Sequence, residues 1–232
     1  MSIIDFHSHI LPKIDDGSKD IDTTVAMLGM CEGKGVDIMV ATPHFYAEKD
    51  RIDKFLERRQ RAYEQVMALD VKRPEIRLGA EVAYFPGISK ADRIEELTIE
   101  GTRAMLLEMP FETWSSPVVC EVERLINDRN LHIILAHIER FLKFPGNKPF
   151  VDEVLKLPVS VQVNAAPLTD ALRRGKLLKL FDRGQAHLLG SDCHGLSHRP
   201  PNVWEGRSII EKKLGKSALD RIDEHGAKLL GL

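Results

Sequence analysis

A His-x-His motif lies near the start of the sequence, where one serine separates His7 from His9. Side chains of an extended segment alternate between two faces, so both imidazoles lie on the same side. Imidazole nitrogens and carboxylate oxygens are ligands for Zn, Fe or Mn. A lone motif of this kind is a weak signal, so its meaning depends on similar residues elsewhere in the chain.

Further histidines and carboxylates occur where short apolar segments end. The residues in these positions are His44, Glu81, Glu108, His137, Asp192 and His194. Asp16, in the run Ile14-Asp15-Asp16-Gly17, is an additional candidate, and Glu81 could bridge two ions. Ionisable side chains at the ends of apolar strands are costly when unpaired. A metal cluster removes this cost for all of them together, so the sequence predicts one.

The apolar segments are rich in Ile and Val, which is typical of parallel strands buried on both faces. The predicted strands are Ile3–Phe6, Asp37–Ala41, Ile76–Ala80, Ala104–Glu108, His132–Ala136, Val159–Val163 and His187–Gly190. Segments with helical spacing alternate with them. The predicted helices are Asp22–Gly33, Arg51–Leu69, Pro117–Arg129, Phe150–Leu157, Asp170–Asp182, Asn202–Leu214 and Ser217–Leu230.

This alternation favours an α/β fold in which seven strands form a (β/α) barrel with one unit missing or distorted. An open doubly wound sheet is the alternative. In both architectures the carboxyl ends of the strands meet at one mouth, where active sites lie. We expect one domain over residues 1–232, with the stretch Ala83–Gly101 as an insertion over the strand ends. His132, His187 and His225 fall elsewhere and are expected to be structural.

The composition excludes several protein classes. Basic residues number 33 and acidic residues 35, which argues against a nucleic-acid partner. Three cysteines cannot form a disulfide scaffold and suit a reducing compartment. The first residues include acids and histidines where a signal peptide would be apolar, and no window is apolar enough to span a membrane. We therefore expect a cytoplasmic protein without membrane insertion.

The motifs together resemble those of the PHP (polymerase and histidinol phosphatase) superfamily. Within it they are most similar to the bacterial tyrosine-protein phosphatases of capsular and exopolysaccharide operons. The motifs are DFHSHILPKIDDG, TPHF, LGAEV, LLEMP, AHIERF and SDCHG. They extend from the first strand to about Arg199. The sequence differs slightly from the common patterns AHPER and SDAHN, and neither difference removes a candidate ligand.

The resemblance implies a distorted (β/α)₇ barrel with three divalent metal ions, Mn more than Fe or Zn. His7, His9, Glu81 and Asp192 would hold the first ion. Glu81, Glu108 and His137 would hold the second, and Asp16, His44 and His194 the third. Four carboxylates with three divalent ions leave a net charge of about +2, which would attract a phosphate dianion. The resemblance also implies that Arg140 and Arg199 bind phosphate.

The implied reaction is hydrolysis of phosphotyrosine by a hydroxide that bridges two ions. A tyrosine leaving group has a pKa of about 10 and needs little help from a general acid. His44 or a coordinated water could supply that help. Phe45, Tyr46, Tyr84 and Phe85 are candidates to contact the aromatic ring, although rim packing explains them equally well. The expected partner is the C-terminal tail of a membrane-associated tyrosine kinase that controls polysaccharide synthesis.

Three other interpretations compete with this one. Cys193 and Arg199 match the Cys-x5-Arg signature of cysteine-dependent phosphatases, but Asp192 would disfavour a neighbouring thiolate. A small-molecule phosphatase, such as histidinol phosphatase, would use the same metal ligands. A non-catalytic metal-binding module that only binds a partner is the third alternative.

Overall fold

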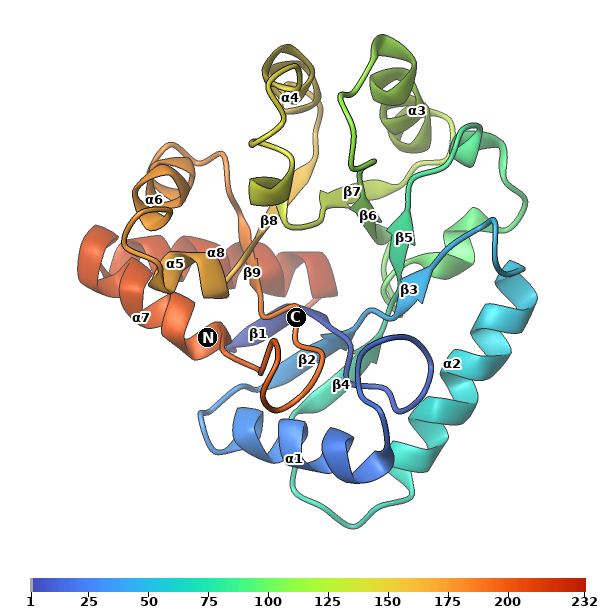
Figure 1. The fold of residues 1–232 in the computed structure, drawn as a ribbon, viewed down its shortest axis with the longest axis vertical. Coiled ribbons are helices and arrows are strands. Elements are labelled where there is room, and N and C mark those ends of the chain that lie inside the picture. The colour runs from blue at the N-terminus through green and yellow to red at the C-terminus, as the bar shows by residue number, and fades with distance from the viewer. Residues whose placement is uncertain (1) are drawn as a thin grey trace.

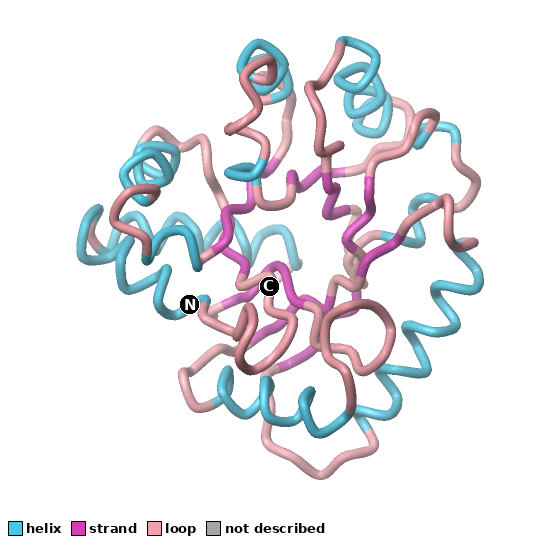
Figure 2. The backbone as a smooth tube through the Cα atoms, in the orientation of Figure 1, coloured by secondary structure: helices cyan, strands magenta, loops and turns pink. Residues whose placement is uncertain are grey.

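A ring of parallel strands forms the centre of the computed structural model, which describes residues 2–232 (Figure 2). Within these residues the strands are β1 (Ile4–Ser8), β2 (Ile38–Ala41), β3 (His44–Phe45), β4 (Glu75–Leu78), β5 (Glu81–Ala83), β6 (Ala104–Glu108), β7 (His132–Leu135), β8 (Ser160–Asn164) and β9 (Leu188–Gly190). Two of the predicted strand positions are kinked, since β3 directly follows β2 and β5 directly follows β4. The nine short strands therefore occupy seven positions around the ring.

Hydrogen bonding joins the strands in the orders β1-β2-β4 and β3-β5-β6-β7-β8-β9, and every pair is parallel. The segment after β9 lies beside β1. There the Asp192 amide donates to the His7 carbonyl at 2.7 Å, and the His9 amide donates to the Cys193 carbonyl at 3.0 Å. These contacts connect the last strand to the first. The predicted distorted (β/α)₇ barrel is thus confirmed, and the open sheet is not formed.

Helices surround the ring on its outer side (Figure 1). They are α1 (Ile21–Glu32), α2 (Ile52–Met67), α3 (Ser116–Asn127), α4 (Lys148–Val154), α5 (Ala166–Thr169), α6 (Arg174–Asp182), α7 (Val203–Leu214) and α8 (Lys216–Leu230). The Asp20 carboxylate caps α1 by accepting from the Thr23 amide at 2.8 Å. The predicted helix Asp170–Asp182 begins only at Arg174, because Asp170 instead closes a turn by accepting from the Leu172 amide at 2.9 Å.

The expectation that Ala83–Gly101 is an insertion over the strand ends is wrong. This segment is the crossover from β5 to β6, and it contains two 3-10 helices, η1 (Ile88–Lys90) and η2 (Ile94–Leu97). Ile88, Ile94 and Leu97 are buried in the core that lies outside the ring. Arg129, just after α3, donates to the Ala91 carbonyl at 3.1 Å and holds the crossover against the barrel wall.

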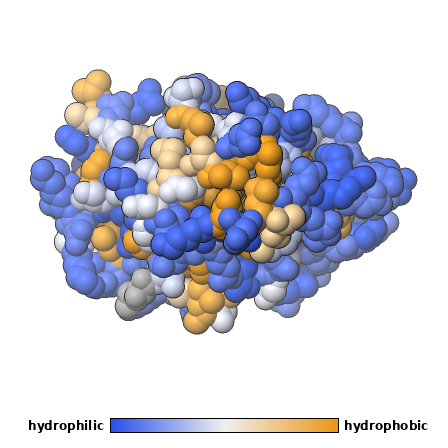
Figure 3. Space-filling model, turned by 90° about the horizontal axis from the view of Figure 1, so that it is seen from below, coloured by the Kyte–Doolittle hydropathy of each residue, from blue (hydrophilic) through white to orange (hydrophobic). Residues whose placement is uncertain are grey.

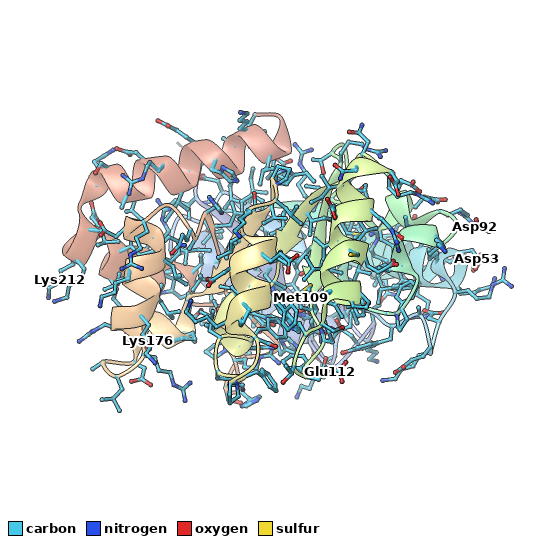
Figure 4. All side chains as sticks on the ribbon, turned by 90° about the horizontal axis from the view of Figure 1, so that it is seen from above. Asp53, Asp92, Met109, Glu112, Lys176 and Lys212 are labelled. Carbon is cyan, nitrogen blue, oxygen red and sulfur yellow. The ribbon has the colours of Figure 1, made fainter. Side chains whose placement is uncertain are left out.

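The inside of the ring is apolar toward the amino ends of the strands. The buried residues of this inner core are Ile4, Phe6, Ile38, Val40, Ile99, Ala104, Leu106, Ile134, Ala136, Leu188 and Leu230. Leu230 belongs to α8, which closes this pole of the barrel. Figure 4 shows α8 along one edge, with Glu112, which follows β6, near the opposite edge. The predicted metal ligands lie at the other pole, at the carboxyl ends of the strands.

The outer surface is largely hydrophilic, although Figure 3, which looks onto the side of α1, shows hydrophobic atoms gathered near its middle. Met30 on α1 is 37% exposed. Among the described helices, none has both the length and the apolar character that crossing a membrane would require.

Three histidines surround Ser160 near the amino-terminal pole. The Ser160 hydroxyl lies 2.7 Å from His132 Nε2 and 2.6 Å from His225 Nε2, and the rings of His187 and His225 stack with centroids 5.0 Å apart. Burial lowers the pKa of each histidine. For His225, burial together with the repulsion of His187 and His132 lowers the pKa to about 4.

This cluster predicts a pH dependence of stability. The pKa of an unfolded histidine is about 6.5, so protonation favours the unfolded chain, and the cluster's contribution is fully present above that pH. It is lost as the pH falls from about 6.5 toward 4. We expect His225→Gln to reduce the decrease in melting temperature between pH 7 and pH 5, measured by circular dichroism. An unchanged decrease would contradict this explanation.

Candidate metal centre

The carboxyl ends of the strands bring all nine predicted ligands to one mouth of the barrel. They lie on or directly after β1, β3, β5, β6, β7 and β9. All are buried except His44, whose side chain is 13% exposed, and Asp16, whose side chain is 69% exposed. The structure thus establishes the proximity of these nine side chains.

The first predicted group converges closely. His7 Nε2 lies 3.1 Å from His9 Nε2, 3.2 Å from Glu81 Oε2 and 3.5 Å from Asp192 Oδ1. His9 Nε2 lies 3.3 Å from Glu81 Oε2 and 3.5 Å from Asp192 Oδ1. Two ligand bonds of about 2.1 Å to one ion separate their donor atoms by roughly 3.0–3.4 Å. The spacing of these four side chains therefore fits a shared cation.

The second group contains His137, whose Nε2 lies 2.7 Å from Glu81 Oε1 and 3.2 Å from Glu108 Oε1. Glu81 thereby reaches both groups with its two oxygens, as a bridging carboxylate would.

In the third group, Asp16 Oδ1 is 3.5 Å from His44 Nε2 and 3.5 Å from His194 Nε2. The ring of His9 packs against that of His194 with centroids 3.9 Å apart, so His9 stands between the first and third groups.

Within the described part of the chain, two buried polar atoms of the centre lack hydrogen-bond partners, which also fits cation binding. Glu81 Oε2 and His194 Nε2 are buried, and neither makes a well-directed hydrogen bond within residues 2–232. Buried polar atoms without such partners are rare and costly. A divalent cation would satisfy both atoms, and a set of only imidazole and carboxylate donors suits Mn, Fe or Zn.

Charge interactions shift the pKa values strongly. Burial alone would lower the pKa of His137, but hydrogen bonds to Glu108 and Glu81 raise it to about 9. Burial would raise the pKa of Glu81, yet the attraction of His7 and a hydrogen bond from His137 lower it well below the usual range. The carboxylates therefore attract protons to the same places where they would attract cations, and cation binding must displace those protons.

Two supporting residues were not identified from the sequence. Asp15 Oδ2 accepts from His9 Nδ1 at 2.7 Å and from the His44 amide at 3.0 Å. Gln162 Oε1 lies 3.2 Å from His7 Nδ1 and accepts from the His137 amide at 2.8 Å. Such bonds to the second ring nitrogen fix the tautomer and orientation of an imidazole ligand. The available signals were the first acid of the Asp-Asp-Gly run and a polar residue within a buried strand.

Both predicted phosphate-binding arginines lie at the mouth. Arg140 donates to Asp192 Oδ2 and Arg199 donates to Asp192 Oδ1. Three residues here have left-handed backbone conformations, with φ of 30° at His137, 53° at Asp192 and 55° at Arg199. Non-glycine residues rarely adopt such angles, and strained backbone conformations tend to cluster at functional sites.

The other candidates at the mouth differ in access. Cys193 is fully buried, and burial raises the pKa of its thiol well above the usual range, so it is unsuited to act as a thiolate nucleophile. Phe45 is also buried, with its ring 5.3 Å from that of Phe55, and cannot contact a substrate. Tyr46 and Tyr84 instead line a hollow beside Glu108.

A family model described as capsular polysaccharide synthesis, CpsB/CapC, matches residues 3–230. The chain belongs to this family. It is 28% identical to the tyrosine-protein phosphatase CpsB of Streptococcus pneumoniae, over 98% of each chain. It is 26% identical to the tyrosine-protein phosphatase YwqE of Bacillus subtilis (strain 168), over 98% of this chain and 91% of that one.

Solved structures share the fold of this CpsB/CapC family member. A crystal structure from work on YwqE and CpsB, described there as unique metal-dependent tyrosine phosphatases, superposes with a TM-score of 0.82 at 21% identity. The match covers 99% of this chain and 94% of that one. A phosphotriesterase homology protein from Escherichia coli, solved with phosphate in its active site, gives a TM-score of 0.56 at 12% identity over 99% of this chain and 98% of that one.

The contacts of Asp15 predict its contribution to metal binding. We expect Asp15→Asn to weaken Mn²⁺ binding by about 10- to 100-fold, because the variant no longer holds His9 with a charged acceptor. Competition with a chromophoric chelator measures the affinity. Asp92→Asn, which neutralises an exposed acid outside the mouth, is the matched control. Equal affinities of the two variants would rule out this role for Asp15.

Proposed function

We propose that this protein is a metal-dependent protein-tyrosine phosphatase, a phosphoric monoester hydrolase. The observation that carries the proposal is the convergence of five histidines and four carboxylates on one buried mouth, with two arginines at its edge. Relatives that match over nearly their whole length are named tyrosine-protein phosphatases, which supports the same activity.

Three divalent ions, with Mn preferred, would be held by the nine residues in the groups described above. When bound, such ions supply Lewis-acid chemistry and lower the pKa of coordinated water toward about 7. The residues of the chain have three tasks around them. They position the cations, orient the imidazoles through hydrogen bonds to their second ring nitrogens, and bind the phosphoryl group.

Arg140 and Arg199 would bind the phosphoryl oxygens. A planar guanidinium can donate two parallel hydrogen bonds to a phosphate. Both arginines already point to Asp192, so a phosphate bound by them would lie directly beside the metal centre. There the two positive charges would also stabilise the additional negative charge of the transition state.

His44 was predicted both as a ligand and as a proton donor. Its Nδ1 is 2.9 Å from Glu81 Oε2 and its Nε2 is 3.5 Å from Asp16 Oδ1, so both ring nitrogens face carboxylates. This arrangement favours the ligand role. Since a tyrosine leaving group has a pKa of about 10, the reaction does not require a strong general acid.

The substrate would be a phosphotyrosine protein. We propose the C-terminal tail of a membrane-associated tyrosine kinase that controls capsular or exopolysaccharide synthesis. The description of the family as one of capsular polysaccharide synthesis supports this choice.

Removal of metal tests the proposed activity. We expect a chelator to abolish hydrolysis of a phosphotyrosine peptide, Mn²⁺ to restore it, and Cys193→Ser to leave it essentially unchanged, because the thiol is buried and protonated. Metal analysis of the purified protein accompanies the assay. Activity that survives chelation but is lost in Cys193→Ser would assign the reaction to the cysteine. Faster turnover of histidinol phosphate would instead identify a small-molecule phosphatase.

Two variants separate phosphate binding from metal binding. We expect Arg140→Ala to retain its metal but to lose about 2–4 kcal/mol of transition-state stabilisation, or roughly 30- to 900-fold in kcat/KM. His137→Ala should lose metal together with activity. Arg183→Ala removes an exposed arginine just after α6 and is the control. Unchanged kcat/KM in Arg140→Ala would refute its role.

A further inference from the structure

A groove of about 840 Å³ begins at the metal centre and extends along the outside of the barrel mouth. Asp192, Arg140 and Arg199 lie at its inner end. Its walls come from η3 (Ile138–Arg140) and the residues after it, from α5 and from α6. The groove is therefore continuous with the place where the phosphoryl group is proposed to bind.

The walls of this groove are strongly cationic. Lys143, Arg173 and Lys176 line it in addition to the two arginines at its inner end. Within residues 2–232, Lys143 and Lys176 are exposed and form no ion pair, and Arg173 pairs only with Asp170, at 3.2 Å. The chain as a whole has a net charge of −2, so this positive charge is a local feature.

The carboxylates of the groove offset only part of this charge. Asp192 is buried and already bound by both arginines. Glu139 is the second carboxylate of the lining, so the five lysines and arginines outnumber the two acids. Two exposed leucines, Leu172 at 92% and Leu142 at 42%, lie along the same walls. A ligand that combines negative charge with some apolar surface would complement them.

We propose that this groove binds the peptide segment that flanks the scissile phosphotyrosine, and that it selects segments carrying negative charge. The inference rests on the proposed phosphatase function and assigns a sequence preference to its substrate. Carboxylate side chains and a second phosphotyrosine would both supply the required anion. An extended peptide advances about 3.3 Å per residue, so residues next to the phosphotyrosine would enter the groove directly.

Phosphopeptides that differ only in the flanking residues test this preference. The flanks are glutamate, a second phosphotyrosine, glutamine or lysine. For the wild-type protein we expect kcat/KM about tenfold higher for both anionic peptides than for the lysine peptide at low salt. The difference should shrink at 0.5 M salt, because the screening length falls to a few ångströms. If only one of the two anionic peptides is preferred over the lysine peptide, that result identifies whether the groove binds carboxylates or a second phosphotyrosine.

Charge reversal locates the preference in the groove. In the double variant Lys143→Glu with Lys176→Glu, we expect kcat/KM for the anionic peptides to fall to the value for the lysine peptide or below it, so that the ratio between anionic and lysine peptides is lost. The matched control, Lys212→Glu with Lys213→Glu, makes the same charge change on exposed residues of α7 and should keep the ratio. Figure 4 shows Lys176 on α6 and Lys212 on α7. A milder variant, Lys176→Gln, should lower the ratio partially.

Several results would overturn the inference. They are equal kcat/KM for all peptides, an unchanged ratio after charge reversal in the groove, and an equal loss in the α7 control. A groove variant that loses binding to anionic phospholipid vesicles but keeps its peptide preference would make the groove a membrane surface instead. If no peptide is hydrolysed, the proposed function fails. In that case, the dissociation constants of fluorescent versions of the same peptides still show whether the groove binds anionic flanks more tightly than the lysine flank.

Discussion

The mouth of the barrel is organised around one buried carboxylate, Glu81, which is only 1% exposed. Its Oε2 lies within 3.3 Å of nitrogens of His7, His9 and His44, and its Oε1 lies 2.7 Å from His137. A charge this deeply buried is costly unless several partners compensate it. The partners here come from β1, β3 and β7, so compensation of one charge also fixes how these strands meet.

The barrel separates the sources of stability from the sources of chemistry. Its inner core is apolar toward the amino ends of the strands, and Leu230 of α8 closes that end. The carboxyl ends carry the charged residues and the left-handed backbone of His137, Asp192 and Arg199. The strained and polar mouth is therefore supported by a core to which its residues do not contribute, which is the usual division in barrel enzymes.

Much of this organisation could be predicted from the sequence. The seven strand positions, most helices and all nine residues at the mouth follow from apolar periodicity and from the polar residues that end each strand. The kinks between β2 and β3 and between β4 and β5 could not be predicted, because they arise from closure of the ring. The role of Asp15 could not be predicted either, since only the fold shows that this acid contacts His9. Its neighbour Asp16 was predicted from the sequence, and it faces the third group.

The contact between β1 and the segment after β9 joins segments that lie far apart in the sequence. During synthesis, His7 and His9 leave the ribosome well before Asp192 and His194. Protein domains fold in the order in which they emerge, and contacts between distant parts of a chain form slowly. The mouth of the barrel is therefore completed only after β9 and the residues that follow it have been synthesised, and chains that end before Asp192 do not contain it.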